Sequence, residues 1–124
     1  MKASQKVPAS VFVRACPSRL LLGKLANKWS LLIIDALANK RRRNGELLRM
    51  IEGISQKMLT QSLRELEEMA LVRRHDLQTV PPHVEYELTD LGRSLRKEVA
   101  RLDRWLEDNM QEITCALSGQ RQCI

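Results

Sequence analysis

Polar side chains able to pair with nucleic-acid bases recur along the segment that follows Ser55. Gln56, Lys57, Thr60, Gln61 and Arg64 have the spacing of one face of an α-helix. Gln can pair with adenine, Arg or Lys with guanine, and the methyl group of Thr can contact thymine. A solvated helix exterior is the other interpretation of such a face. Its place directly after a glycine turn favours contact with bases.

Further basic side chains flank this segment on both sides. Lys40-Arg41-Arg42-Arg43 precedes it, and Arg73, Arg74 and His83 follow it around a predicted hairpin. A charge run is usually a solvated loop, but here it lies where backbone phosphates would pass. The predicted contact set is Arg41, Arg42, Arg43, Ser55, Gln56, Lys57, Thr60, Gln61, Arg64, Arg73, Arg74 and His83.

The charge distribution favours a polyanionic partner. The net charge is +6, and residues 1–28 carry six basic side chains and no acidic one, whereas residues 84–113 carry five basic and eight acidic ones. Lys and Arg near phosphates release condensed counterions, which drives binding. Charge alone does not distinguish DNA from RNA or from an anionic membrane.

Several classes of function are disfavoured by composition. Three cysteines without a Cys-x-x-Cys pair and only two histidines make a zinc site or a histidine-based catalytic triad improbable, so we expect no cofactor and no enzyme. No apolar run approaches the ~20 residues of a membrane-spanning helix, and the N-terminus has no apolar signal core. We therefore expect a cytoplasmic protein without a membrane partner.

The hydrophobic pattern predicts one mainly α-helical domain over residues 1–124 with a small β-hairpin. Helical spacing begins at Pro17 and resumes over residues 29–38 and 45–51. Gly53 then makes a turn, and Ser55 caps the next helix, residues 56–69. Alternating segments 71–75 and 84–88 predict a hairpin around Pro81-Pro82. This is the order of a winged helix-turn-helix (α+β).

The last predicted helix is longer and more apolar than a small core requires. After Thr89, apolar residues repeat every three or four positions up to Ile113, close to the seam of a coiled coil. The seam can fold back on the core or pair with a second copy, and the equally apolar first helix favours a homodimer through the N- and C-terminal helices. The predicted interface comprises Leu20, Leu21, Leu95, Val99, Leu102, Trp105 and Leu106.

The order and spacing of short segments carry a resemblance to a known family. These are Cys16-Pro17, Lys28-Trp29, Arg42-Arg43 before Glu46-Leu47, Gly53-Ile54-Ser55, residues 57–61, 63–67 and 71–74, Pro81-Pro82 with residues 84–86, Leu88-Thr89 and Leu91-Gly92. Together they resemble the HxlR family of MarR-like bacterial transcriptional regulators over residues 16–107. A basic arm, residues 1–15, and a frayed tail, residues 118–124, lie outside the resemblance.

The resemblance implies a homodimeric winged-helix protein in which residues 55–69 enter the major groove and residues 73–86 lie along flanking backbone or minor groove. Two positions depart from the family pattern. Asn44 replaces a usual aromatic residue, which weakens packing at the start of the third helix. Ala70 replaces a usual glycine, so a residue with a Cβ must make the turn that ends the helix.

Cys16 is a candidate redox sensor, because cysteines before the first helix sense oxidants or electrophiles in some relatives. Arg14, Arg19 and the N-terminus of the following helix would stabilise its thiolate, while a small buried apolar residue is the alternative. Cys115 and Cys123 lie outside the resemblance and are expected to be incidental.

The sequence thus predicts a transcriptional regulator, more readily a repressor than an activator. It would bind a pseudo-palindromic site in double-stranded DNA as a dimer, with a small molecule or oxidant as effector. The alternative is a winged-helix module that docks a protein partner and does not bind DNA.

Overall fold

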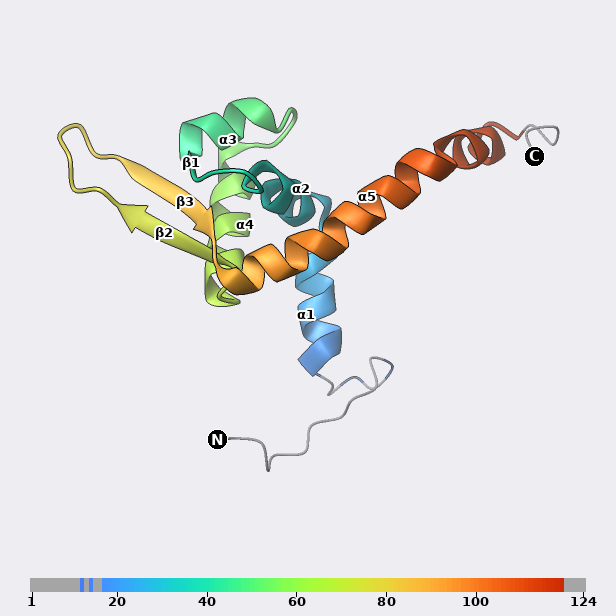
Figure 1. Ribbon diagram of the computed structural model, residues 1–124, viewed down its shortest axis with the longest axis horizontal. Coiled ribbons are helices and arrows are strands. Elements are labelled where there is room, and N and C mark those ends of the chain that lie inside the picture. Colours follow the sequence, from blue (N-terminus) through green and yellow to red (C-terminus); the bar gives the residue numbers. More distant parts are fainter. Residues whose placement is uncertain (1–11, 13, 15–16, 120–124) are drawn as a thin grey trace.

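The computed structural model describes residues 12, 14 and 17–119 of the chain. Its elements are α1 (Pro17–Leu25), α2 (Lys28–Ala36), β1 (Arg42–Arg43), α3 (Asn44–Met50), α4 (Gln56–Glu68), β2 (Val72–Asp76), β3 (Val84–Leu88) and α5 (Asp90–Leu117). Helices α2, α3 and α4 and the sheet form one body, from which α1 and the C-terminal part of α5 project (Figure 1). This is the predicted winged helix-turn-helix. None of the described helices combines the length and apolar character that crossing a membrane requires.

The core lies where α2, α3 and α4 meet the sheet and the first half of α5. Its buried members are Ile33, Ile34, Leu37, Leu47, Ile51, Ile54, Leu59, Leu63, Leu66, Leu71, Val72, Leu88 and Val99. The helical spacing over residues 29–38 predicts a buried stripe through Trp29, Leu32, Ile33, Ala36 and Leu37. In the structure Leu32 is 42% exposed, and Ile34, which lies outside this stripe, is fully buried. Helix α2 contacts both α4 and α5, so its buried face is set by two neighbours rather than one.

Local hydrogen bonds close α4 at both ends, as predicted. Gly53 adopts φ +90°, and the Ser55 hydroxyl then accepts a bond of 3.0 Å from the amide of Met58. At the other end Ala70 adopts φ +62°, and the amide of Leu71 donates to the carbonyl of Leu66 at 3.0 Å. An alanine therefore makes the left-handed turn that glycine usually makes.

Thr89, which follows the second strand of the hairpin, stabilises the conformation of Ala70. The Thr89 hydroxyl donates to the carbonyl oxygen of Ala70 at 2.6 Å and accepts from the amide of Gly92 at 3.0 Å. Thr89 thus caps α5 and also ties the start of this helix to the end of α4. The left-handed turn, which costs ~1–2 kcal/mol without glycine, is held by this bond.

The sheet has three strands, in the order β1-β3-β2. Strands β2 and β3 form the hairpin, in which Val72 pairs with Leu88. Strand β1 pairs with the other edge of β3, where Arg42 lies opposite Tyr86. Arg42 and Arg43, which the sequence predicts to be part of a basic loop, form β1. A strand of two residues is too short to show an alternating pattern, so only its pairing partner reveals it.

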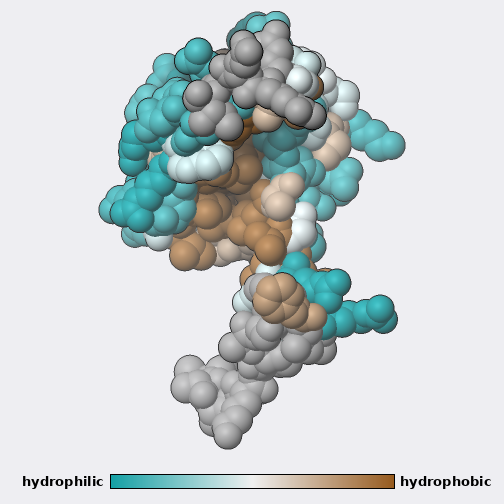
Figure 2. All heavy atoms as spheres, turned by 90° about the vertical axis from the view of Figure 1, so that its right-hand side faces the viewer, coloured by the Kyte–Doolittle hydropathy of each residue, from teal (hydrophilic) through white to brown (hydrophobic). Residues whose placement is uncertain are grey.

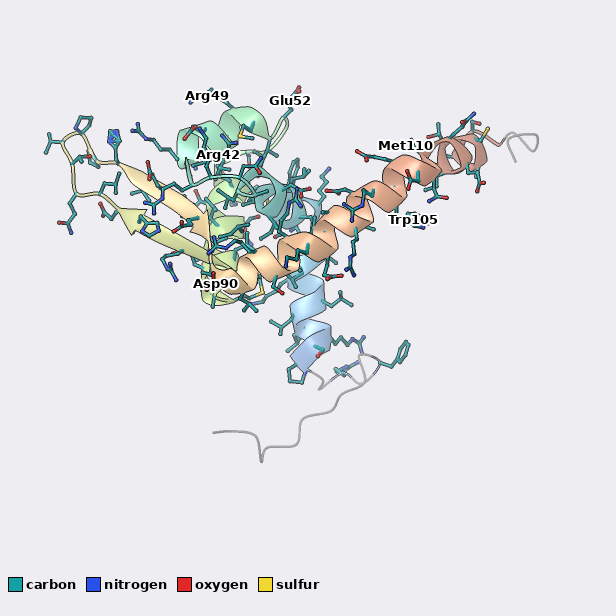
Figure 3. The ribbon with its side chains drawn as sticks, viewed as in Figure 1. Arg42, Arg49, Glu52, Asp90, Trp105 and Met110 are labelled. Atoms are coloured by element: carbon teal, nitrogen blue, oxygen red, sulfur yellow. The ribbon has the colours of Figure 1, made fainter. Side chains whose placement is uncertain are left out.

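Helix α5 divides into two parts with different surroundings. Near its start, Leu95 packs against the core and Val99 is only 4% exposed, whereas Trp105 and Met110, which lie on the projecting part, are more than half exposed (Figure 3). Val99 therefore belongs to the core of the monomer, which corrects its place in the predicted interface. The remaining predicted interface residues, Leu20, Leu21, Leu102, Trp105 and Leu106, all have exposed side chains.

Candidate nucleic-acid interface

The predicted polar face of α4 faces solvent along its whole length. Leu59, Ser62, Leu63 and Leu66 are buried on the inner side of the helix. Gln56, Lys57, Thr60, Gln61 and Arg64 are exposed and together line one shallow depression. The amide group of Gln56 donates to the Thr60 hydroxyl at 3.0 Å. Within the described residues the Arg64 guanidinium and the Lys57 ammonium form no ion pair.

The depression continues from α4 onto the sheet. A second hollow shares Thr60 and Arg64 with the first and is completed by Glu67, Glu68, Arg74 and Tyr86. Arg74 lies directly opposite Tyr86 on the neighbouring strand, so both side chains occupy the sheet face that meets α4. Tyr86 is not among the predicted contact residues, because only the register of the strands places it here.

The two wing arginines that were predicted together lie on opposite faces of the sheet. Arg73 pairs in register with Glu87, one position away from Arg74, and successive residues of a strand alternate between faces. Arg74 therefore extends the α4 surface, and Arg73 belongs to the other face. His75 lies on that second face too, with Nε2 at 2.7 Å from Oε1 of Glu87, and this contact is the main cause that lowers the pKa of the Glu87 carboxyl.

The basic run before α3 is divided among three different environments. Arg41 lies 3.5 Å from both Glu85 and Glu87. The guanidinium of Arg42 donates to the carbonyl oxygen of Ala36 at 2.7 Å and is largely enclosed. The side chain of Arg43 is exposed, and its backbone amide donates to Glu46 at 2.9 Å, which lowers the pKa of that carboxyl.

The tip of the hairpin is organised by its own polar groups. The Thr79 hydroxyl donates to the carbonyl oxygen of Pro81 at 2.8 Å, and Nδ1 of His83 lies 3.0 Å from the same hydroxyl. Val80 is 99% exposed at the tip. His83 therefore stiffens the wing loop and lies beside its most exposed point.

The cysteine predictions fall largely outside the described residues. Cys16 and Cys123 lie there, as does most of the predicted basic arm. Cys115, which was expected to be incidental, is disulfide-bonded. Among the described residues there is no cluster of three or more His, Cys, Asp or Glu side chains arranged to hold a metal ion.

A second surface has the opposite character. No residue of α1 is buried, although this helix carries four leucines. An open groove of about 450 Å³ runs between α1, the end of α4 and the first half of α5, and its lining is apolar except for Ser94, Glu68 and Glu98. Apolar side chains gather on one hollowed face, bordered by hydrophilic ones (Figure 2).

Comparisons with known proteins agree with the fold. A family described as HxlR-like helix-turn-helix matches residues 24–114. The HTH-type transcriptional regulator YtfH of Escherichia coli, itself uncharacterized, is 40% identical over 111 residues, which is 90% of this chain and 88% of that protein. The solved YtfH of Salmonella typhimurium superposes with a TM-score of 0.83 at 38% identity, covering 90% of this chain and 99% of that one.

A further similar structure is a redox regulator. HypR in its reduced form has a TM-score of 0.73 and 35% identity, covering 79% of this chain and 97% of that one.

Proposed function

Because this chain belongs to the HxlR-like helix-turn-helix family of transcriptional regulators, we propose that it acts as a homodimer on a pseudo-palindromic DNA operator. The α4 helices of the two copies would enter successive major grooves, ~34–36 Å apart, which is one turn of B-DNA. The family is one of regulators rather than enzymes, and the arrangement of α4 and the wing suits that role.

The observation that carries the proposal is the exposed face of α4 and its continuation onto the sheet. Gln56, Lys57, Thr60, Gln61 and Arg64 present base-pairing groups without an ion-pair partner in the described chain. Arg74 extends this surface, and Ser55, Arg43 and His83 are candidates for phosphate contact. Arg73, on the opposite face of the sheet, is a further candidate. Arg42, which is bonded to Ala36, contributes by orienting the loop.

A second copy best explains the apolar surface. An isolated helix as short as α1 is marginal in water. Leu25 packs against the core, but Leu20, Leu21 and Leu22 are exposed in the monomer and need another surface. A second copy would supply an apolar surface through the exposed side chains of Leu20, Leu21, Leu102, Trp105 and Leu106, of which Leu21 also lines the groove. A twofold contact of this kind would also set the distance between the two α4 helices.

We further propose that the protein represses transcription and responds to oxidants. Occupying a promoter blocks polymerase without any further contact, which favours repression. HypR is a redox regulator by name, and Cys16, just before α1, is the residue we assign to sensing. Loss of oxidant response in Cys16→Ser, with unchanged DNA binding in the reduced state, would support this assignment.

The operator is identified by selecting bound fragments from genomic DNA at physiological salt, with and without a thiol oxidant. The proposal expects a palindrome and an affinity that falls with salt, at a log–log slope of about −0.9 per neutralised phosphate. The double substitution Gln61→Ala with Arg64→Ala should lower operator affinity at least ~100-fold, because each contact to a base edge is worth ~1–3 kcal/mol.

A matched control removes the same two side-chain types from the exposed surface of α5. Gln111→Ala with Arg104→Ala should leave operator affinity within about twofold of the unaltered protein. If the unaltered protein selects no DNA sequence, the proposal fails and the protein-docking module takes its place.

A further inference from the structure

The sheet face opposite α4 holds one arginine between two carboxylates. Arg41 directs its two terminal nitrogens to Glu85 and Glu87, each at 3.5 Å. The two glutamates are two positions apart on β3, so they share a face, and the forked guanidinium spans them. A guanidinium uses the same fork to bind two oxygens of a phosphate group.

The contact is weak enough to exchange. Both distances are at the upper limit for hydrogen bonds, and the Arg41 side chain is 41% exposed. Exposed pairs of this kind contribute little to stability. When Arg41 leaves, Glu87 keeps its 2.7 Å contact with His75, so this carboxylate still has a hydrogen-bond partner.

The backbone around Arg41 is held independently of this contact. Arg42 is paired opposite Tyr86 and bonded to the carbonyl oxygen of Ala36. The Arg41 side chain can therefore turn away without unfolding β1. It lies just before α3, the first helix of the helix-turn-helix, and beside the exposed Lys40 and Arg43, which form no side-chain ion pair in the described chain.

We propose that Glu85 and Glu87 compete with the DNA backbone for Arg41. In the free protein they hold the guanidinium, and a phosphodiester takes it from them on binding. The inference rests on the proposed DNA-binding function and assigns to β3 a role that lowers affinity. By neutralising a cation that would attract any polyanion, the two glutamates limit binding that does not depend on sequence.

The test measures affinity for a duplex of fixed length without an operator, at one salt concentration. Glu85→Gln with Glu87→Gln should raise affinity about fivefold, since the exposed ion pairs are removed and the Arg41 guanidinium is available to a phosphate. In a chain that also carries Arg41→Gln, the same two substitutions should have no effect. The control Glu107→Gln with Glu112→Gln removes two exposed carboxylates from α5 and should change affinity much less.

Two results would overturn the inference. An equal gain with and without Arg41 would mean that the glutamates only repel phosphates. No gain, together with a lower melting temperature, would mean that the contact is a structural brace. If the double variant unfolds, Glu85→Gln alone provides the test, because Glu87 and His75 remain. Failure of the proposed function is seen separately, as absence of salt-dependent DNA binding by the unaltered protein.

Discussion

Helix α4 and the projecting part of α5 are both amphipathic, but α4 buries its apolar face, whereas the projecting part of α5 leaves its apolar face exposed as well as its polar one. Helix α4 buries Leu59, Leu63 and Leu66 and exposes amide and cationic side chains. The outer part of α5 exposes Leu102, Trp105 and Leu106. An exposed polar face with unpaired cations suits a polyanion, whereas an exposed apolar patch of this kind marks a protein interface. The contrast assigns a different kind of partner to each helix.

The strongest way to break this contrast is to place a charge on the apolar face. Leu106→Glu should raise the dissociation constant of the dimer by about 1,000-fold or more, because a carboxylate would be buried without a cation. Sedimentation across a range of concentrations measures the shift. Met50→Glu, on the similarly exposed Met50 of α3, should leave the dimer intact. A monomeric unaltered protein, or equal effects of both changes, would contradict the assignment.

A second test compares the packed start of α5 with the projecting helix α1. A Cβ added at Gly92 would lie 2.0 Å from the carbonyl oxygen of Leu71, so the backbone would have to shift. Gly92→Ala should therefore lower the free energy of unfolding by roughly 3 kcal/mol, as measured by denaturant titration. Gly23→Ala in α1 meets nothing within 4 Å and should be neutral or slightly stabilising. A neutral Gly92→Ala would contradict the close packing of the start of α5 against Leu71, and an equal loss at Gly23 would mean that α1 is packed as well.

A third test asks whether the DNA-binding surface of α4 extends onto the wing, the hairpin of β2 and β3. Arg74→Gln should weaken operator binding about tenfold, because Arg74 lies in the hollow shared with Thr60 and Arg64. Arg73→Gln, on the opposite face of the sheet, should weaken it about twofold or less. Fluorescence anisotropy with one labelled duplex gives both values. A larger effect at Arg73 than at Arg74 would mean that the main contacts of the DNA lie on the other face of the sheet.

The smallest expected effect lies at the junction between the two parts of α5. Asp35 of α2 and Arg96 are 2.9 Å apart but not aligned for a hydrogen bond. Burial first, and then the hydrogen bond and charge of Asp103, raise the pKa of Asp35 from its ordinary value of 3.8 to about 6. The folded protein thus binds this proton more tightly than the unfolded chain, so the contribution is stabilising at low pH and is lost as pH rises through about 6.

Asp103→Asn should reduce this loss. The variant removes one negative charge and offers an amide donor to Asp35, so the pKa of Asp35 should fall. Thermal unfolding between pH 4 and pH 7 should then show a flatter profile than that of the unaltered protein. The expected difference is on the order of 1 kcal/mol, given ~1.4 kcal/mol per pKa unit and solvent screening at this partly exposed site. Parallel profiles would show that Asp103 does not control the titration.

The elements of the helix-turn-helix could be predicted because their signals are local. The Ser55 cap, the glycine turn at Gly53 and the polar face of α4 depend on residues within a few positions of one another. The turn at Ala70 was expected only from the resemblance to the family, which usually has glycine there, and the hydroxyl of Thr89 that supports it comes from 19 residues away. The order and spacing of the motifs were sufficient to identify the resemblance to the HxlR family.

The remaining features depend on distant segments meeting, so no local pattern contains them. Strand β1 exists only through its pairing with β3, and that register places Arg74 and Tyr86 beside α4 while turning Arg73 away. The burial of Ile34 and Val99 is likewise decided by which neighbouring helices pack against α2 and α5. Periodicity and capping depend on residues close together in the sequence, so the sequence predicts them. Strand pairing and packing depend on residues far apart in the sequence, so only the tertiary structure decides them.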